Sequence, residues 1–353
     1  MKTNSYLSLV LLCIFALLMT SGCSGKKASD PVSNDQPGNS GNQDVFWKAL
    51  ETPASAGCAS TDADNNIWIG TSFGMYKSPD SGSTWNKVTT NGFTSTSSVS
   101  LIRPALSGKI YAMAGSDIYT LNTSQNTWMN ISKNINSSTV TYIKTQTFNL
   151  DKAGNIYACM FVSVKSDPQT IGLDQNIFVK STDGGQTWTE IKIQQFEGQI
   201  IDIAFTSNGA ILLIMDNTVY RSLDGGKTWN HASSGIPSSN PMLLRVNSMN
   251  LVYGGTGNGI MVSGDTGITW SPANYSTYCP SLIINSKDYL FAGAINSVFV
   301  SVDNAEKWVE ISSGLKHSID GFSNCSVQTF DKDGFIYAIL EGVLYKSSVS
   351  TVK

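Results

Sequence analysis

The chain has 353 residues, its net charge is −3, and 14% of its residues are charged. Charge of this low density, with no cluster of Lys or Arg, argues against a nucleic-acid-binding protein. The length exceeds one ordinary hydrophobic core, so internal repeats are the first feature to look for.

Residues 1–22 are typical of a secretory signal peptide, with a positive charge at Lys2 and an apolar run over 7–19 that is too short for a membrane span. The sequence TSGC at 20–23 resembles the lipobox of bacterial lipoproteins, in which the cysteine is lipidated after cleavage. A plain secreted protein is the alternative. We therefore predict export to a bacterial cell envelope, in the periplasm or on the outer-membrane surface, with Cys23 as the lipid anchor.

Residues 23–44 are predicted to form a lipidated flexible tether. Val32 is the only large apolar residue between 24 and 44, so this stretch cannot bury enough surface to offset the entropy of ordering. We expect residues 45–353 to form the folded domain.

The folded part repeats a unit of about 40 residues. A polar turn followed by an apolar strand, as at 106–114, occurs seven times. Each copy is followed by a short alternating strand, as at 117–121, and further apolar segments lie on either side of these two strands. Helical periodicity is absent. Four short strands per unit predict an all-β fold: a seven-bladed β-propeller with four-stranded antiparallel blades.

The last unit ends near 345–349, before a fourth strand. The segment 46–50 has the Trp-x-x-apolar pattern of the other fourth strands, and Trp47 precedes Trp85 by one period. We predict that this N-terminal strand completes the last blade and closes the ring, because it would pair an edge that is otherwise exposed. Trp47 should then lie in the same sheet as Tyr345.

An octapeptide connects the third and fourth predicted strands of most units. Its clear copies are SPDSGSTW (78–85), STDGGQTW (181–188), SLDGGKTW (222–229) and SGDTGITW (263–270), and LNTSQNTW (121–128) and SVDNAEKW (301–308) are weaker copies. The spacing resembles the Asp-box, or BNR, repeat of bacterial sialidases, sortilin-like receptors, xyloglucan-cleaving enzymes and photosystem II assembly factors. The resemblance covers the chain from residue 44 onward. The assembly factors have the most similar plan, a single seven-bladed propeller behind a lipoprotein signal.

We interpret the acids of the octapeptide as structural. Asp and Ser oxygens can accept hydrogen bonds within the turn, Gly permits positive φ, and Trp can fill the wedge between blades. A catalytic group need not recur around a ring, and the resemblance implies that ligands bind on the face opposite the boxes. These acids are Asp80, Asp183, Asp224, Asp265 and Asp303.

The sequence predicts no metal site and no cofactor. No C-x-x-C pair suggests zinc. The turn DKDG at 331–334 would need a glutamate at its twelfth position to resemble a calcium-binding EF-hand loop, and that position is Gly342.

Candidate ligand-binding residues lie on the innermost strands and in long connections. Arg103 and Arg245 share one register, where they could face the central channel and bind an anion, or be satisfied by neighbouring carbonyls. The long gap between Trp128 and Trp188 indicates an extended hairpin. That hairpin contains Asp167 and Asp174. Aromatic residues in the connections could stack on sugars, anchor a partner or be buried between blades: Tyr275, Tyr278 and Phe322.

These patterns favour a binding or scaffold module for a glycan or an envelope protein, monomeric and attached to the membrane through lipid alone. A sialidase-like glycoside hydrolase is the alternative. A sialidase uses three arginines to hold its substrate carboxylate, and only Arg103 and Arg245 are suitably placed. The carboxylates outside the boxes show no spacing that marks a catalytic pair.

Four cysteines remain after the signal peptide and the lipid anchor are set aside. Cys279 and Cys325 lie at equivalent positions in adjacent units and could form a disulfide, with Cys58 as a competing partner. Pairing is possible for Cys159 as well. The sequence alone leaves this connectivity open.

Overall fold

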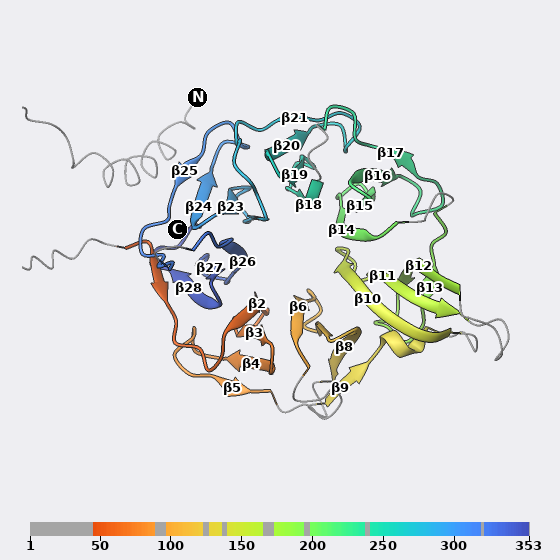
Figure 1. Cartoon of the computed structure of the whole chain (residues 1–353), viewed down its shortest axis with the longest axis horizontal. Coiled ribbons are helices and arrows are strands. Elements are labelled where there is room, and N and C mark those ends of the chain that lie inside the picture. Colours follow the sequence, from red (N-terminus) through yellow and green to blue (C-terminus); the bar gives the residue numbers. More distant parts are fainter. Residues whose placement is uncertain are drawn as a thin grey trace, which may run out of the picture. The chain divides into compact units, whose positions relative to one another are not determined.

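The computed structural model describes residues 45–88, 97–122, 127–135, 140–164, 173–193, 198–236, 241–318 and 321–352. They form seven four-stranded antiparallel sheets arranged as a ring, which confirms the predicted seven-bladed β-propeller (Figure 1). A single turn of 3-10 helix, η1 (Ser132–Asn134), is the only helix in these ranges. The predicted signal peptide and tether, with Cys23, lie outside the described residues.

In blades 1 to 6 the strands follow chain order from the centre of the ring outward (Figure 1). Blade 1 contains β2 (Ala56–Thr61), β3 (Ile67–Thr71), β4 (Gly74–Ser78) and β5 (Asn86–Lys87). Blade 2 contains β6 (Val99–Pro104), β7 (Ile110–Ala114), β8 (Asp117–Asn122) and β9 (Thr127–Asn130). Blade 3 contains β10 (Val140–Leu150), β11 (Ile156–Val164), β12 (Leu173–Ser181) and β13 (Thr189–Glu190).

The remaining blades repeat this plan. Blade 4 contains β14 (Ile200–Phe205), β15 (Ile211–Met215), β16 (Thr218–Ser222) and β17 (Asn230–His231). Blade 5 contains β18 (Pro241–Val246), β19 (Val252–Thr256), β20 (Gly259–Ser263) and β21 (Ser271–Pro272). Blade 6 contains β22 (Ser281–Ile284), β23 (Leu290–Ala294), β24 (Ser297–Ser301) and β25 (Val309–Glu310).

Both ends of the described chain build blade 7. It contains β26 (Ser326–Phe330), β27 (Ile336–Leu340), β28 (Val343–Ser347) and, as its outermost strand, β1 (Trp47–Ala49). Trp47 pairs with Ser347, and Ala49 pairs with Tyr345. The prediction that the segment 46–50 closes the ring is therefore confirmed, with the observed strand one residue shorter at each end.

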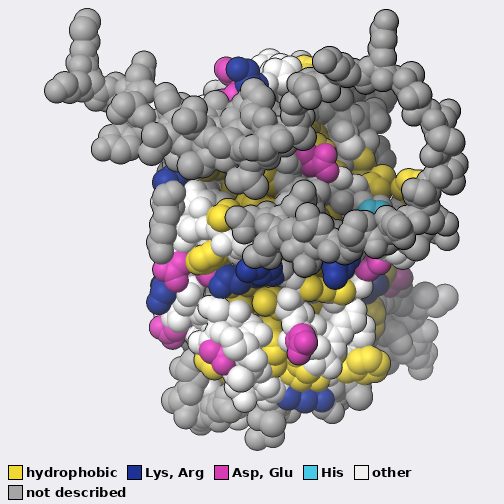
Figure 2. Space-filling model, turned by 90° about the vertical axis from the view of Figure 1, so that its left-hand side faces the viewer, with side chains coloured by type: hydrophobic (Ala, Val, Ile, Leu, Met, Phe, Trp, Pro, Cys, Tyr) yellow, Lys and Arg dark blue, Asp and Glu magenta, His cyan; other side chains and the backbone are white. Residues whose placement is uncertain are grey.

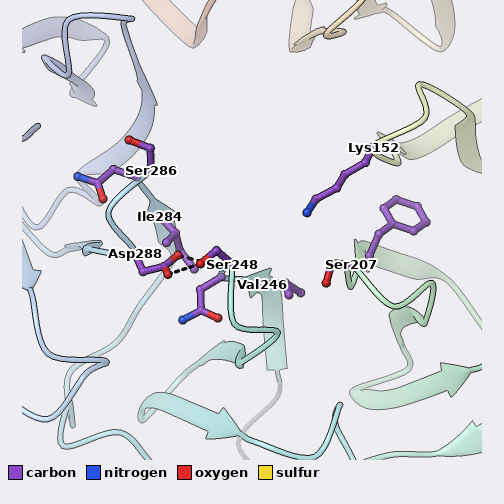
Figure 3. A pocket seen from close by; sticks show the side chains of 10 residues that line it. Lys152, Ser207, Val246, Ser248, Ile284, Ser286 and Asp288 are labelled. Carbon is purple, nitrogen blue, oxygen red and sulfur yellow. Dashed lines mark hydrogen bonds between the residues drawn. The ribbon is translucent and has the colours of Figure 1, made fainter.

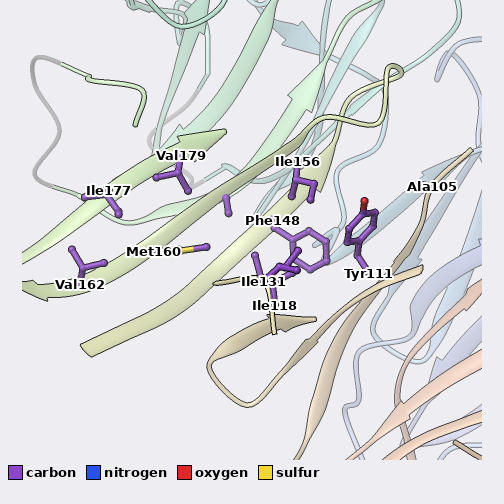
Figure 4. Close-up of a cluster of buried hydrophobic side chains, with 11 residues drawn as sticks. Ala105, Tyr111, Ile118, Ile131, Phe148, Ile156, Met160, Val162, Ile177 and Val179 are labelled. Carbon is purple, nitrogen blue, oxygen red and sulfur yellow. The ribbon is translucent and has the colours of Figure 1, made fainter. Parts of the chain in front are cut away.

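Apolar residues fill the space between neighbouring blades. The second strands β3, β15, β19, β23 and β27 are buried along their whole length, because each face of a blade contacts another blade. Between blades 2 and 3, for example, Tyr111 and Ile118 pack against Phe148, Ile156 and Met160 (Figure 4). Burial of each such side chain contributes about 1.5–3 kcal/mol, so the blades stabilise one another.

Charged residues make up 14% of the chain. On the side shown in Figure 2, Lys, Arg, Asp and Glu are interspersed among uncharged side chains. Within the described ranges, no helix combines the length and the apolar content that a membrane crossing requires.

All four cysteines in the described part of the chain are free and buried. The disulfide between Cys279 and Cys325 that the spacing suggested is not formed. Cys279 instead directs its Sγ at the carbonyl of Ser281, 3.4 Å away, and Cys58 directs its Sγ at that of Val99, 3.6 Å away. Burial raises the pKa of all four thiols to about 12, so they are poor nucleophiles.

Candidate functional site

The two faces of the propeller carry different segments. The first and third strands of each blade run in the same direction, so the turns that follow them lie on one face. This face, which we call the turn face, carries the octapeptides. The opposite face, which we call the connection face, carries the hairpins between second and third strands and the connections from one blade to the next.

The octapeptide turns use their acids within the turn itself. Ser222 Oγ donates to Asp224 Oδ1 at 2.8 Å, and Thr228 donates its backbone N–H to Oδ1 at 2.9 Å and its hydroxyl to Oδ2 at 2.6 Å. The same serine–aspartate bond is present at Asp80, Asp183, Asp265 and Asp303. The hydrogen bonds from Thr228 lower the pKa of Asp224 to about 2. The carboxylate therefore has no proton to donate near neutral pH.

The glycine and tryptophan of the octapeptide join successive blades. Gly226 has φ of 94°, and a Cβ there would lie 2.7 Å from Ile191 of the preceding blade. Trp270 donates its indole N–H to the carbonyl of Ala232, also in the preceding blade, at 2.7 Å. Ala305 replaces the glycine in one copy and still has a positive φ of 71°. These contacts account for the octapeptide without catalysis. Half of the copy at 121–128, residues 123–126, lies outside the described residues.

Arg245 lies on the innermost strand β18 and joins three blades. Its Nη1 forms an ion pair with Asp202 Oδ2 in blade 4 at 2.9 Å, and its Nε donates to the carbonyl of Leu282 in blade 6 at 2.8 Å. The same Asp202 oxygen accepts the backbone N–H of Leu244 at 2.8 Å. Arg245 is thus partly satisfied by neighbouring carbonyls. Sequence reasoning did not connect Asp202 with it, because the two residues belong to different repeats.

Arg103 occupies the same register on β6 but has no such partners. Its guanidinium forms no hydrogen bond or ion pair with any residue that the structure describes. It interacts electrostatically with Arg245 and Asp202, which come from the innermost strands of blades 5 and 4. Desolvation, followed by the positive charge of Arg245, lowers the pKa of Arg103 to about 10, so the group remains charged at neutral pH.

A pocket of about 230 Å³ lies on the turn face, where the innermost strands end (Figure 3). Val246 and Ile284, which end β18 and β22, form part of its wall, and Lys152 extends toward its open space. Ser248 on its rim donates its N–H and its hydroxyl to Asp288 at 2.9 and 2.5 Å. Sequence reasoning placed ligands on the opposite face and did not anticipate this pocket.

The predicted aromatic candidates differ in how far their side chains are exposed. Tyr275 is buried between blades, with its ring centroid 4.8 Å from that of Trp308, so it cannot stack on a ligand. Tyr278 is partly buried, whereas Phe322 is 89% exposed. Asp174 is exposed on the long hairpin of blade 3, and Asp167 lies outside the described residues.

Hydrogen bonds hold the backbone on either side of Phe322. Glu341, in the β27–β28 hairpin, accepts bonds from the hydroxyls of Ser318 and Ser323 at 2.9 and 3.0 Å. Asn296, in the β23–β24 hairpin, donates to the carbonyl of Gly321 at 2.7 Å. The hydrogen bonds from Ser318 lower the pKa of Glu341. Sequence reasoning missed this network, whose members belong to two blades and the connection between them.

Comparisons with known proteins identify the fold but no family. No family model matches the chain, and no curated protein matches it. Among solved structures, YCF48 bound to a D1 peptide is similar, with a TM-score of 0.61 and 13% identity over 87% of this chain and 96% of that one. A streptogramin B lyase gives a TM-score of 0.64 and 13% identity over 86% of this chain and 97% of that one.

A third similar structure belongs to a larger protein. The extracellular domain of a putative one-component system of B. thetaiotaomicron gives a TM-score of 0.63 and 14% identity over 87% of this chain. This chain covers 40% of that one. At such low identities, the three similarities show that the chain is a β-propeller and leave its ligand open.

Proposed function

We propose that this protein is a lipid-anchored propeller of the bacterial cell envelope that binds a partner protein through its connection face. The observation that carries the proposal is Phe322, a ring that is 89% exposed although the backbone around it is hydrogen-bonded to two blades. A large aromatic side chain on a preordered loop is a typical anchor residue, because binding costs little additional ordering.

Apolar neighbours extend the surface around Phe322. Ile295 is 40% exposed at the tip of the β23–β24 hairpin, and its backbone pairs with Asn324. Val343 is also exposed, and it lies two residues after Glu341, which holds the loop. Three exposed apolar side chains from blades 6 and 7 and their connection form a surface suited to an apolar segment of a partner.

The same geometry argues against a glycoside hydrolase. Such an enzyme needs a carboxylic acid with a raised pKa and a second carboxylate about 5–10 Å away. The pKa values of Glu341 and Asp224 are lowered, and Asp202 is paired with Arg245. A glycan is the second candidate ligand, because Phe322 and Tyr278 present aromatic rings on the connection face.

Two further observations support the assignment. The hydrogen bonds of Asp224 and the positive φ of Gly226 are what an Asp-box turn requires, which supports placing the chain among the Asp-box propellers. YCF48, a propeller of similar shape, has been solved with a D1 peptide bound. In this proposal the chain acts as a monomer behind a lipid anchor.

The test uses a photo-activated cross-linker placed at residue 322, or at residue 223 on the turn face. Leu223 is 64% exposed and serves as the matched control. With detergent-solubilised envelope, the 322 probe should give one dominant cross-linked protein, and Phe322→Ala should weaken its capture at least tenfold while Leu223→Ala does not. Equal cross-linking from both positions would overturn the proposal. Binding or cleavage of an arrayed glycan without a protein partner would favour the alternatives.

A further inference from the structure

The pocket on the turn face is surrounded by the ends of the innermost strands of blades 3 to 6 and the turns that follow them. In Figure 3, Lys152 and Ser207 lie on one side of its open space. Ser248, Ser286 and Asp288 lie on the other side. The pocket has about 230 Å³. Pockets for drug-sized ligands have about 300–1,000 Å³, so this one is suited to a smaller molecule.

Two of these turns are linked to the next blade by the same pair of hydrogen bonds. Ser207 donates its N–H and its hydroxyl to Asn250 Oδ1 of blade 5 at 2.7 and 2.8 Å. Ser248 donates the same two groups to the carboxylate of Asp288 in blade 6 at 2.9 and 2.5 Å. Each hydroxyl has given its proton to the link and keeps oxygen lone pairs that can accept a hydrogen bond from a ligand.

Two other residues of the pocket occupy the same turn position but lack the link. They are Lys152 in blade 3 and Ser286 in blade 6. The acceptor position of the next blade is a glycine in both cases, Gly209 and Gly334, so it has no side chain that can accept. Lys152 and Ser286 are exposed, and neither side chain forms a hydrogen bond or an ion pair with a residue that the structure describes. Their donors are therefore available to a ligand.

Asn247, which also lines the pocket, has a donor without a partner. Its Oδ1 accepts the N–H groups of Met249 and Leu251 at 3.1 and 2.9 Å, so its Nδ2 is the side-chain donor. This Nδ2 is buried and has no hydrogen-bond partner in the described part of the chain. An enclosed donor without an acceptor is destabilising, so an oxygen that a ligand placed beside it would stabilise the site.

The lining favours an uncharged ligand with several hydroxyl groups. Lys152 and Asp288 are the only charged residues that line the pocket, and their charges cancel. They lie on opposite sides of the open space, whereas an α-amino acid carries both of its charges beside one carbon. Free donors and free acceptors together match hydroxyl groups, because a hydroxyl both donates and accepts. Phe205, Val246 and Ile284 add apolar wall against which C–H groups can pack.

We propose that the pocket on the turn face binds one neutral sugar ring, either a free monosaccharide or the terminal residue of a glycan. Lys152 and Ser286 donate hydrogen bonds to the hydroxyls of the ring. Ser207, Ser248 and Asp288 accept hydrogen bonds from them. The site lies on the face opposite the proposed partner surface and does not depend on partner binding.

Saturation-transfer difference NMR on the purified chain tests this site, with the methyl glycosides of glucose, galactose, mannose and N-acetylglucosamine as probes. We expect at least one probe to bind with a Kd of about 1 mM, as is usual for a ligand of about a dozen heavy atoms. Lys152→Met should weaken that binding about tenfold and Ser286→Ala about threefold, because each variant loses one donor. Equal binding of a trisaccharide that ends in the same ring assigns the site to glycans, and its exclusion assigns the site to free monosaccharides.

Lys332→Met is the matched control. Lys332 occupies the same turn position in blade 7, is exposed and does not line the pocket. Its link to Asn65 of blade 1 uses the backbone N–H, which donates at 2.9 Å, so the side chain can be replaced without loss of that bond. This variant should bind the probe as the wild type does. Phe322→Ala should also bind it as the wild type does, which separates this site from the connection face.

Three results would overturn the inference. Absence of saturation transfer from all four glycosides at about 10 mM, tenfold above the expected Kd, would exclude a sugar site. Equal binding by the wild type and Lys152→Met, or a loss of binding in Phe322→Ala, would place the sugar elsewhere. Glucuronate or glucosamine that bound at least tenfold more tightly than every neutral glycoside would contradict the neutral class.

Discussion

Replacing Trp47 by alanine tests whether the N-terminal strand holds the ring closed. The Trp47 ring is buried, packs edge-on against Phe46 with 5.2 Å between centroids, and donates its indole N–H to the carbonyl of Ile311 in blade 6 at 2.6 Å. Truncating a buried tryptophan costs about 3–5 kcal/mol, and the unpaired Ile311 carbonyl places the cost toward the upper end. Met129→Ala, on an exposed edge of blade 2, should cost less than about 0.5 kcal/mol.

Urea unfolding followed by far-UV circular dichroism measures both variants, since removal of a tryptophan would disturb fluorescence. Trp47→Phe should give an intermediate loss, because it keeps an aromatic ring but not the N–H donor. Trp85→Phe should lower the free energy of unfolding less, since the indole N–H of Trp85 has no hydrogen-bond partner among the described residues. If Trp47→Ala lowered the free energy of unfolding no more than Met129→Ala does, pairing of the N-terminal strand in blade 7 would contribute nothing to stability. That result would refute the prediction.

Three further predictions address the turns and the thiols. Gly226→Ala should destabilise the protein more than Gly225→Ala in urea unfolding, because both have positive φ but only Gly226 would force a Cβ against a neighbour; equal losses would contradict a steric role. The pKa of Asp224 is lowered to about 2 by the Thr228 hydrogen bonds. The stability that this group contributes should therefore be complete above about pH 4, its unfolded pKa, and be lost as the pH falls toward 2. In Asp224→Asn the urea midpoint should fall less between about pH 4 and pH 2 than in the wild type. If the pH profile of the variant were the same as that of the wild type, Asp224 would not contribute this stability. A thiol reagent should leave the native protein unmodified, because the described cysteines are buried, and should modify each of them after denaturation without reductant, as mass spectrometry can show. If two of them reacted only after reduction, they would form a disulfide, which would contradict the free thiols Cys58, Cys159, Cys279 and Cys325.

Much of the fold could be read from local patterns. The alternation of strands and turns repeats along the chain, and a strand buried on both faces, such as β27, needs an apolar sequence wherever its partners come from. The closure by Trp47 was also predictable, because an incomplete last repeat and an isolated first strand together make one blade. The hydrogen bonds that the aspartate of the octapeptide accepts join residues at most four apart, so the structural role of this acid was accessible as well.

The fate of individual side chains was decided by the tertiary structure. Arg103 and Arg245 occupy the same place in their repeats, yet only Arg245 has a carboxylate and a carbonyl supplied by its neighbours. Tyr275 and Phe322 both follow fourth strands, yet one ring is buried between blades and the other is exposed. A pattern within a repeat determines which strand forms and which residues face inward. Whether a polar or aromatic group is paired, buried or free depends on residues about one repeat away, which meet it only when the blades pack.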